Sequence, residues 1–317
     1  MGGKRRIEAS AFPPPGPVAR TARPRIGLAL GGGGARGLAH IVALEAFDDL
    51  GLKPSVIAGT SMGAILGAAY ASGLSGREIR RQVEETLAVR VALVRDIFSM
   101  RSRAFTRPLK LFSPLTALLS SEALVETVYP SGVATTFEDL AIPMKVVATD
   151  FYGLGQAVFS SGPLRPAVAA SMALPAVFEP VIIDGRALVD GGLVNPLPFD
   201  LIAAECDITV AIDVSATPSP SAKRVHPTAT EALFGAPAIF ERTILREKLK
   251  TVRPDILIEA GIGHFQLLDL WRTKEILAAA EPIRARIVAS LGKVISAETV
   301  PALDTPTKRL NKPDAKP

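Results

Sequence analysis

The stretch RIGLALGGGGARG, residues 25–37, decides the fold of this chain. It joins a short apolar run, residues 25–30, directly to a loop that consists almost entirely of glycine. A short apolar run bounded by glycine is typical of a buried strand in a parallel sheet. The stretch therefore predicts a strand that enters a glycine loop and then a helix, the repeating unit of an α/β protein.

Two later motifs have the same design. The sequence GTSMG, residues 59–63, follows the apolar run 55–58, and the sequence DGG, residues 190–192, follows the apolar run 187–189. Catalytic groups of open α/β sheets gather beyond the carboxyl ends of the strands. We therefore expect all three motifs to follow strands of the parallel sheet and to converge at one edge.

The second motif has the form of a nucleophile elbow. A serine on a sharp strand-to-helix turn holds its hydroxyl above the sheet, and the residues two before and two after it must be very small. Gly59 and Gly63 meet that demand around Ser61. The small apolar residues 64–70 predict a buried helix, whose N-terminus favours developing negative charge near Ser61.

A membrane span is the alternative for this region, because residues 54–76 contain no charged side chain. The region begins at a proline, carries interior glycines and hydroxyl groups, and lacks a centre rich in Leu, Ile or Phe. These features favour a buried strand followed by a buried helix.

The glycine loop predicts an oxyanion hole, because glycines leave successive amides free to point at one oxygen. We assign this role to Gly32, Gly33, Gly34, Arg36 and Gly37. Arg36 either neutralises a carboxylate or orients the loop, and the alternative is an arginine in solvent. A dinucleotide site is the rival interpretation of the loop, but the sequence GTS stands where its ribose-binding acid is expected.

The base that deprotonates Ser61 is the least evident member of the site. The candidate base is Asp190, which Gly191 and Gly192 follow, although an isolated DGG sequence is more often a simple turn. His264 follows Asp190 and leaves a Ser-Asp-His triad open, whereas His40 lies in a predicted helix and His226 in a Pro/Ser/Lys-rich stretch.

Taken together, the motifs resemble those of the bacterial patatin-like phospholipase family. The resemblance extends over about residues 24–291. The matching pieces are residues 30–40, residues 59–63, residues 170–180, residues 190–192 and residues 195–198.

The resemblance implies a Ser-Asp dyad with Ser61 as nucleophile, Asp190 as general base and the amides around Gly32 to Gly34 as the oxyanion hole. It implies hydrolysis of lipid acyl esters, of the phospholipase A or lysophospholipase type, without a metal or other cofactor. We expect a three-layer α/β/α hydrolase with a mainly parallel central sheet. Asp190 then needs a raised pKa or close coupling to Ser61, because a carboxylate is a weak base for a serine.

Composition sets the outer limits. With 317 residues, of which 48% are hydrophobic, the chain can build one large domain, which we place at residues 25–296. The Arg-, Pro- and Gly-rich residues 1–24 and the Pro-rich residues 297–317 are expected to be disordered tails. The single cysteine, Cys206, excludes an internal disulfide, and its apolar neighbours indicate burial.

The net charge of +5 suits an anionic phospholipid surface, and no nucleic-acid motif is present. We expect a cytoplasmic protein that contacts the inner membrane surface peripherally, with the basic and apolar residues 101–112 as one docking segment. An ordinary packed loop is the alternative for that segment. Residues 216–230, before an amphipathic stretch at 239–249, are a candidate cover for the site. A binding protein that has lost turnover would be expected to lack Ser61 or Asp190.

Overall fold

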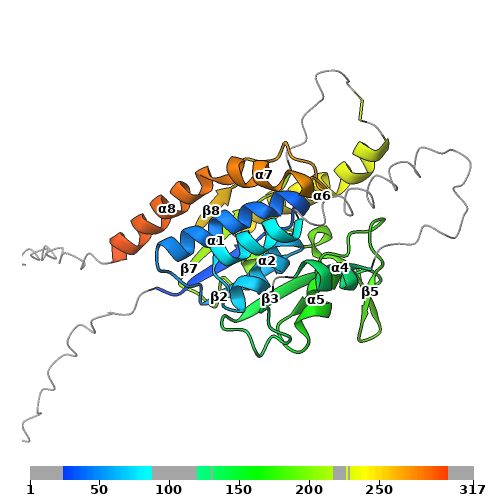
Figure 1. Cartoon of the computed structure of the whole chain (residues 1–317), viewed down its shortest axis with the longest axis horizontal. Helices are drawn as coiled ribbons and strands as arrows, with labels where there is room; N and C mark the ends of the chain where they lie inside the picture. The colour runs from blue at the N-terminus through cyan, green and yellow to red at the C-terminus, as the bar shows by residue number, and fades with distance from the viewer. Residues whose placement is uncertain (1–23, 88–119, 130, 217–225, 228, 299–317) are drawn as a thin grey trace, which may run out of the picture.

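The computed structural model describes residues 24–87, 120–129, 131–216, 226–227 and 229–298, and in that part of the chain eight strands form one sheet (Figure 1). The strands are β1 (Ile26–Leu30), β2 (Val56–Thr60), β3 (Met144–Asp150), β4 (Gly155–Phe159), β5 (Val181–Ile183), β6 (Arg186–Asp190), β7 (Ile208–Asp213) and β8 (Ile256–Glu259). The expected docking segment 101–112 and most of the two expected tails lie outside the described residues. The same holds for residues 217–225 of the candidate cover.

The centre of the sheet is parallel, as predicted. The strands β3, β2, β1, β7 and β8 lie in that order and run in one direction. Three further strands are antiparallel to their neighbours: β4 and β6 pair with β3, and β5 pairs with β6. The strand before Asp190 was expected to be parallel, and that expectation is wrong, because β6 runs against β3.

The register along β3 brings the second and third motifs together. One edge of β3 pairs with β4 over residues 146–150. On the other edge β2 pairs up to Thr60 opposite Val147, and β6 then takes over with Asp190 opposite Ala148. The strands β2 and β6 therefore approach each other end to end along the same edge. Ser61 leaves β2 at the place where Asp190 ends β6.

Helices cover both faces of the sheet and complete the predicted three-layer arrangement. The helical elements are η1 (Gly34–Leu38), α1 (Ala39–Asp49), α2 (Met62–Ala71), α4 (Ser121–Val128), α5 (Leu164–Ser171), η2 (Gly191–Leu193), η3 (Phe199–Leu201), α6 (Ala229–Thr251), η4 (Leu270–Arg272), α7 (Thr273–Ala280) and α8 (Pro282–Glu298). Leu28 and Leu30 of β1 face the layer of α1, α2, α5, α7 and α8, while Ala29 faces α6 and the turn η3. Residues 76–87 are also helical.

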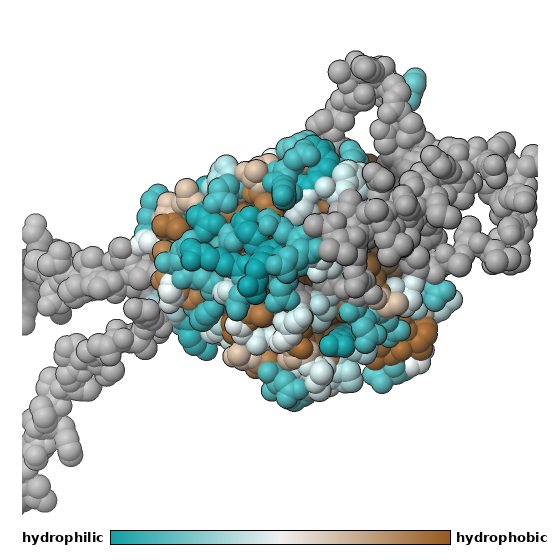
Figure 2. Space-filling model, in the orientation of Figure 1, coloured by the Kyte–Doolittle hydropathy of each residue, from teal (hydrophilic) through white to brown (hydrophobic). Residues whose placement is uncertain are grey.

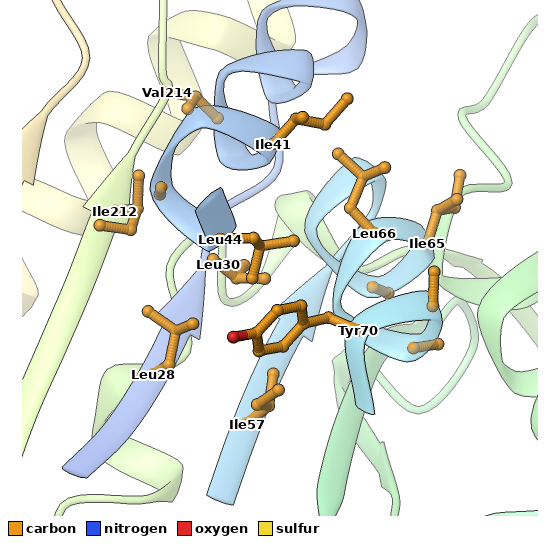
Figure 3. Close-up of a cluster of buried hydrophobic side chains, with 14 of the residues drawn as sticks. Leu28, Leu30, Ile41, Leu44, Ile57, Ile65, Leu66, Tyr70, Ile212 and Val214 are labelled. Atoms are coloured by element: carbon orange, nitrogen blue, oxygen red, sulfur yellow. The ribbon is translucent and has the colours of Figure 1, made fainter. Parts of the chain in front are cut away.

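The larger core lies between the sheet and the helices α1 and α2. Figure 3 shows Leu28, Leu30 and Ile57 from the strands against Leu44 of α1 and Tyr70 of α2. All five are 1% exposed or less. Burial of one such aliphatic side chain contributes about 1.5–3 kcal/mol, so this core fixes α2, and with it Ser61, against β1 and β2.

The uncharged region 54–76 contains β2 and α2, which confirms the prediction of a buried strand followed by a buried helix. Among the described residues, no helix has both the length and the apolar character that a membrane crossing requires. Cys206 is only half-buried, so the expected burial is incomplete. Its thiol donates to the carbonyl oxygen of Ile202 at 3.3 Å.

Candidate active site

Ser61 occupies the strained turn that the elbow motif predicts. It stands between β2 and α2 with φ 54° and ψ −120°, a conformation that L-residues rarely adopt. Its carbonyl oxygen accepts hydrogen bonds from the amides of Ala64 and Ile65, at 2.9 and 3.2 Å. Such backbone strain costs about 1–3 kcal/mol and persists only where the surroundings enforce it.

The two elbow glycines have no room for a side chain. A β-carbon on Gly59 would lie 2.7 Å from the carbonyl oxygen of Gly63, and a β-carbon on Gly63 would overlap the carbonyl oxygen of Leu30. Both contacts are shorter than carbon and oxygen tolerate. The elbow therefore packs directly on β1, which ends at the glycine loop.

Ser61 and Asp190 are in direct contact. The Ser61 hydroxyl donates to Asp190 Oδ2 at 2.7 Å, and the amide of Gly192 donates to the other carboxylate oxygen at 2.8 Å. Both side chains are buried, with 9% and 6% of their surface exposed. The Thr149 hydroxyl also donates to the carbonyl oxygen of Asp190 at 2.7 Å, which fixes the end of β6 on β3.

The burial of Asp190 makes it a stronger base than an ordinary aspartate. Burial raises the pKa of Asp190 to about 6, against the opposing effect of the hydrogen bonds from Gly192 and Ser61. The carboxylate is therefore charged at neutral pH but binds a proton more tightly than an aspartate in water. In this dyad the raised pKa and the close coupling to Ser61 occur together.

Not every amide of the glycine loop is free. The amide of Gly31 donates to the carbonyl of Ile212, that of Gly32 to Pro196 at 2.9 Å, and that of Ala35 to Leu267 at 2.8 Å. Among the described residues, no acceptor is paired with the amides of Gly33 and Gly34. Gly32 was grouped with these two as an oxyanion donor, but its amide holds the loop to the segment that follows the DGG motif.

Close packing explains the glycines of this loop. A β-carbon on Gly33 would lie 2.8 Å from both Val214 Cγ2 and the Val214 carbonyl oxygen, and one on Gly37 would lie 2.5 Å from Met62 Cβ. Gly34 has φ 55°, in the left-handed region that favours glycine. A β-carbon on Gly32 would lie 3.5 Å from Ser61 Cβ, which places the loop against the serine.

Arg36 is buried and holds the loop from behind. Its Nε donates to the carbonyl oxygen of Val214 at 3.1 Å and its Nη1 to that of Phe265 at 3.0 Å. Burial lowers the pKa of Arg36, and the charges of Glu241, Asp213 and Asp269 oppose that effect. The alternative of an arginine in solvent is wrong. The guanidinium ties η1 to the segments that follow β7 and β8 and thereby orients the loop.

Two polar residues of the site carried no assignment in the sequence. The Ser171 hydroxyl accepts from the amide of Ser61 at 2.8 Å and donates to the carbonyl oxygen of Val147 at 2.5 Å. His40 is fully buried, and its Nε2 donates to the carbonyl oxygen of Gly31 at 2.8 Å. Burial lowers the pKa of His40 to about 4, so it is neutral at pH 7. Ser171 lies within the matching piece 170–180, which was the available signal.

The histidines stand apart from the dyad. His226 and His264 are exposed, and the ring of His264 lies against that of Phe265. In the described ranges no hydrogen bond joins a histidine to Ser61 or Asp190. The geometry therefore gives no support to a triad through His264.

The described residues contain no group of three or more His, Cys, Asp or Glu side chains that could hold a metal ion. The DGG glycines instead serve the carboxylate. Gly192 supplies an amide to Asp190, and a β-carbon on Gly191 would overlap the carbonyl oxygen of Val147. That Ser61 and Asp190 catalyse without a cofactor stays a prediction.

Comparison with known proteins gives one family. The family model described as patatin-like phospholipase matches residues 28–203. An "Uncharacterized NTE family protein" of Mycobacterium tuberculosis is 34% identical over 221 residues, which cover 68% of this chain and 57% of that protein. The "Neuropathy target esterase sws" of Drosophila melanogaster is 32% identical over 179 residues, covering 56% of this chain and 12% of that protein.

Among solved structures, VipD from Legionella pneumophila matches with a TM-score of 0.46 and 14% identity, over 84% of this chain and 67% of that one. The chain spans just over half the length of the mycobacterial relative and a small part of the Drosophila relative.

Proposed function

Because the chain belongs to the patatin-like phospholipase family, we propose that it is a serine acyl-ester hydrolase that cleaves fatty-acyl esters of phospholipids or lysophospholipids. The proposal assigns Ser61 as the nucleophile and Asp190 as the general base. It assigns the amides of Gly33 and Gly34 as oxyanion donors, because they are the two loop amides without an acceptor among the described residues.

In the proposed reaction, Asp190 Oδ2 accepts and releases one proton in each of the two steps, acylation and deacylation. Ser61 Oγ attacks the ester carbonyl carbon while its proton passes to Asp190 Oδ2, and the loop amides stabilise the negative charge on the carbonyl oxygen. The tetrahedral intermediate collapses, and the proton on Asp190 leaves with the alcohol. Water then gives a proton to Asp190 and attacks the acyl-enzyme. The fatty acid leaves, and the proton returns to Ser61.

One observation carries the proposal: a serine held in a strained elbow conformation donates a 2.7 Å hydrogen bond to a buried carboxylate with a raised pKa. A serine that serves only to cap a helix needs neither the strain nor the carboxylate. Residues whose environment shifts their pKa and whose geometry pairs a nucleophile with a base are the usual mark of a catalytic site.

A fluorophosphonate probe tests the nucleophile. We expect a single labelled site at Ser61 in the wild-type chain and no label in Ser61→Ala. Ser131→Ala is the matched control, because Ser131 is an exposed serine outside the site, and this variant should label normally. Mass spectrometry of the labelled peptides and circular dichroism of each variant are the measurements. Label on another serine, or hydrolysis by folded Ser61→Ala, would reject the assignment.

We further propose that the protein contacts an anionic membrane peripherally from the cytoplasmic side. Large apolar side chains project from the turn after β3 and from β5: Tyr152 is 82% exposed, Leu154 88% and Ile182 65%. Figure 2 shows brown residues at the right edge of the molecule, where Figure 1 labels β5. Because β3 continues past Val147, its turn extends beyond the level of Thr60 and Ser61.

A further inference from the structure

Glu241 is a buried carboxyl group that the proposed reaction does not use. It lies on α6 and is only 7% exposed. Its Oε2 atom is buried without a hydrogen-bond partner among the described residues. A buried carboxylate without a donor is costly when it is charged, so its position calls for a physical reason.

The position of Gly192 shows how close Glu241 is to the dyad. A β-carbon on Gly192 would lie 2.8 Å from Glu241 Oε1 and 3.2 Å from Asp190 Oδ1. The two carboxyl oxygens are therefore separated by no more than the sum of these distances, about 6 Å. At such a separation the two groups cannot both carry a charge without raising the proton affinity of one of them.

Burial and the neighbouring charges together decide which of the two carboxyl groups keeps the proton. Glu241 faces the carboxylates of Asp190 from β6 and Asp213 from β7, and the guanidinium of Arg36 from η1. Arg36 is already bound to two carbonyl oxygens, and Asp213 is paired with Arg242 at 2.9 Å. Burial first, and then the charge of Asp190, raises the pKa of Glu241 to about 8. Asp190 instead has two hydrogen-bond donors, Ser61 and Gly192.

We propose that Glu241 is a positioning residue of the active site: it stands beside Gly192 as an uncharged acid, so that the pair with Asp190 carries one negative charge, and it keeps water from Asp190. This inference rests on the proposed function for its catalytic meaning. In the proposed reaction the single negative charge stays on Asp190, whose carboxylate accepts the hydrogen bond of Ser61. Shielding by α6 keeps that carboxylate a stronger base than an aspartate in water.

The charge state of Glu241 is testable without any activity measurement. An acid with a pKa near 8 when folded and near 4.5 when unfolded binds more protons in the folded state between these values. Its contribution to stability is therefore complete below pH 4.5 and is lost as the pH rises through about 8. We expect wild-type protein to lose more stability between pH 5 and pH 8 than Glu241→Gln, which has no such titration.

Glu247→Gln is the matched control, since Glu247 lies on the same helix, is exposed and pairs with Lys250. Thermal melting at pH 5, 6, 7 and 8 should give this control the wild-type pH dependence. If Glu241→Gln also shows the wild-type dependence, Glu241 does not hold a proton in the folded state and the inference fails.

The effect on Asp190 requires a kinetic readout. For hydrolysis of a small soluble ester, the acid limb of kcat/KM should lie near pH 6 in wild type. Glu241→Ala admits water beside Asp190, and the limb should move down by about one pH unit. Glu241→Gln fills the same space without charge and should keep the limb near pH 6. A limb that stays at the wild-type pH in folded Glu241→Ala would overturn the shielding role.

These outcomes are separable from failure of the proposed function. If Asp190→Asn hydrolyses the ester as well as wild type, Asp190 is not the base and the proposed function fails. The melting comparison still decides whether Glu241 carries a proton.

Discussion

At the scale of single residues, the proposed dyad depends on Asp190, whose carboxylate is a stronger base than that of an aspartate in water. The pKa of Asp190 lies near 6 because burial penalises its charged form more than Ser61 and Gly192 stabilise it. Proton transfer from Ser61 is then less uphill than transfer to an aspartate in water. Ser171 fixes the position of Ser61, because its hydroxyl links the amide of Ser61 to the carbonyl oxygen of Val147 in β3. In the proposed mechanism, Asp190 accepts the proton of Ser61 directly, a step that a histidine performs in a Ser-His-Asp triad.

The first residue-level prediction concerns the base. Asp190→Asn keeps the shape of the side chain but cannot accept the proton, so kcat should fall by about 10³-fold or more. In wild type, kcat/KM should rise with pH through about 6, because Asp190 must lose its proton before it can act. His264→Ala should keep most of its activity and serves as the control. Steady-state hydrolysis of a soluble ester between pH 4 and 8 measures the activity of each variant and the pH dependence of the wild type. An equal loss of activity in Asp190→Asn and His264→Ala would instead favour a Ser-Asp-His triad.

The second concerns the oxyanion donors. Gly33→Ala forces the loop away from Val214, because a β-carbon would lie 2.8 Å from that residue. Loss of one oxyanion donor costs about 10²–10³-fold in kcat. Gly235→Ala, where a β-carbon would meet nothing within 4 Å, should match wild type. Separate values of kcat and KM decide the matter, since a change in KM alone would make the loop a ground-state binding element.

Local steric demands made part of this site predictable from the sequence. Gly59, Ser61 and Gly63 stand at the fixed spacing that a nucleophile elbow requires, so this local motif can be recognised in the sequence. Glu241 and Ser171 could not be assigned in this way, because their roles arise from tertiary contacts across the fold. The same holds for the amide of Gly32, which is paired with Pro196.

At the scale of elements, β3 acts as the template of the site. The parallel strands β1 and β2 were predictable, because an apolar run that leads into a glycine motif marks each of them. The reversed direction of β6 was not, since a three-residue apolar run carries no information about its partner. Asp190 nevertheless meets Ser61, because β2 and β6 share one edge of β3. Ser61 and Asp190 therefore converge as predicted, although the expected direction of the strand before Asp190 was wrong.

A buried charge cluster joins three helices and yields an element-level prediction. Glu45 of α1 is 3% exposed and binds Arg80 of the helix 76–87 at 2.6 Å and Arg284 of α8 at 2.6 Å. Burial would raise the pKa of Glu45, but hydrogen bonds and charges from the two arginines outweigh it, so the pKa is lowered. The stabilisation is therefore present above the unfolded pKa and is lost as the pH falls through the folded pKa.

We expect Glu45→Gln to lower the free energy of unfolding by about 1–3 kcal/mol at pH 7, because two charge-assisted hydrogen bonds are weakened. Glu275→Gln, in an exposed pair with Arg272, should change stability far less, because solvent screens an exposed ion pair. Urea denaturation at pH 7 and pH 3 compares them. Equal stability of Glu45→Gln and wild type at pH 7 would show that the cluster does not hold α1 and α8 together.

At the scale of the whole molecule, the proposed substrate requires the site to reach a lipid surface. The apolar turn 151–154 and β5 lie at the end of the sheet beyond Ser61, and the chain carries a net charge of +5. The positive charge and the apolar side chains would contribute to membrane binding with different dependence on salt. Attraction of cations to anionic lipid contributes about 1 kcal/mol per charge and is screened by salt. Insertion of apolar side chains is not screened.

The last prediction separates the two contributions. We expect vesicles with anionic lipid to bind the protein more tightly than neutral vesicles, and moderate salt to release most of it. Replacement of Arg101, Arg103 and Arg107 by glutamine should remove the salt-sensitive part, whereas Tyr152→Ser with Leu154→Ser should weaken the binding that remains at high salt. Both variants should hydrolyse a soluble ester at the wild-type rate, because neither changes the dyad or its loop. Vesicle sedimentation that responds to neither salt nor these substitutions would rule out both segments as membrane contacts.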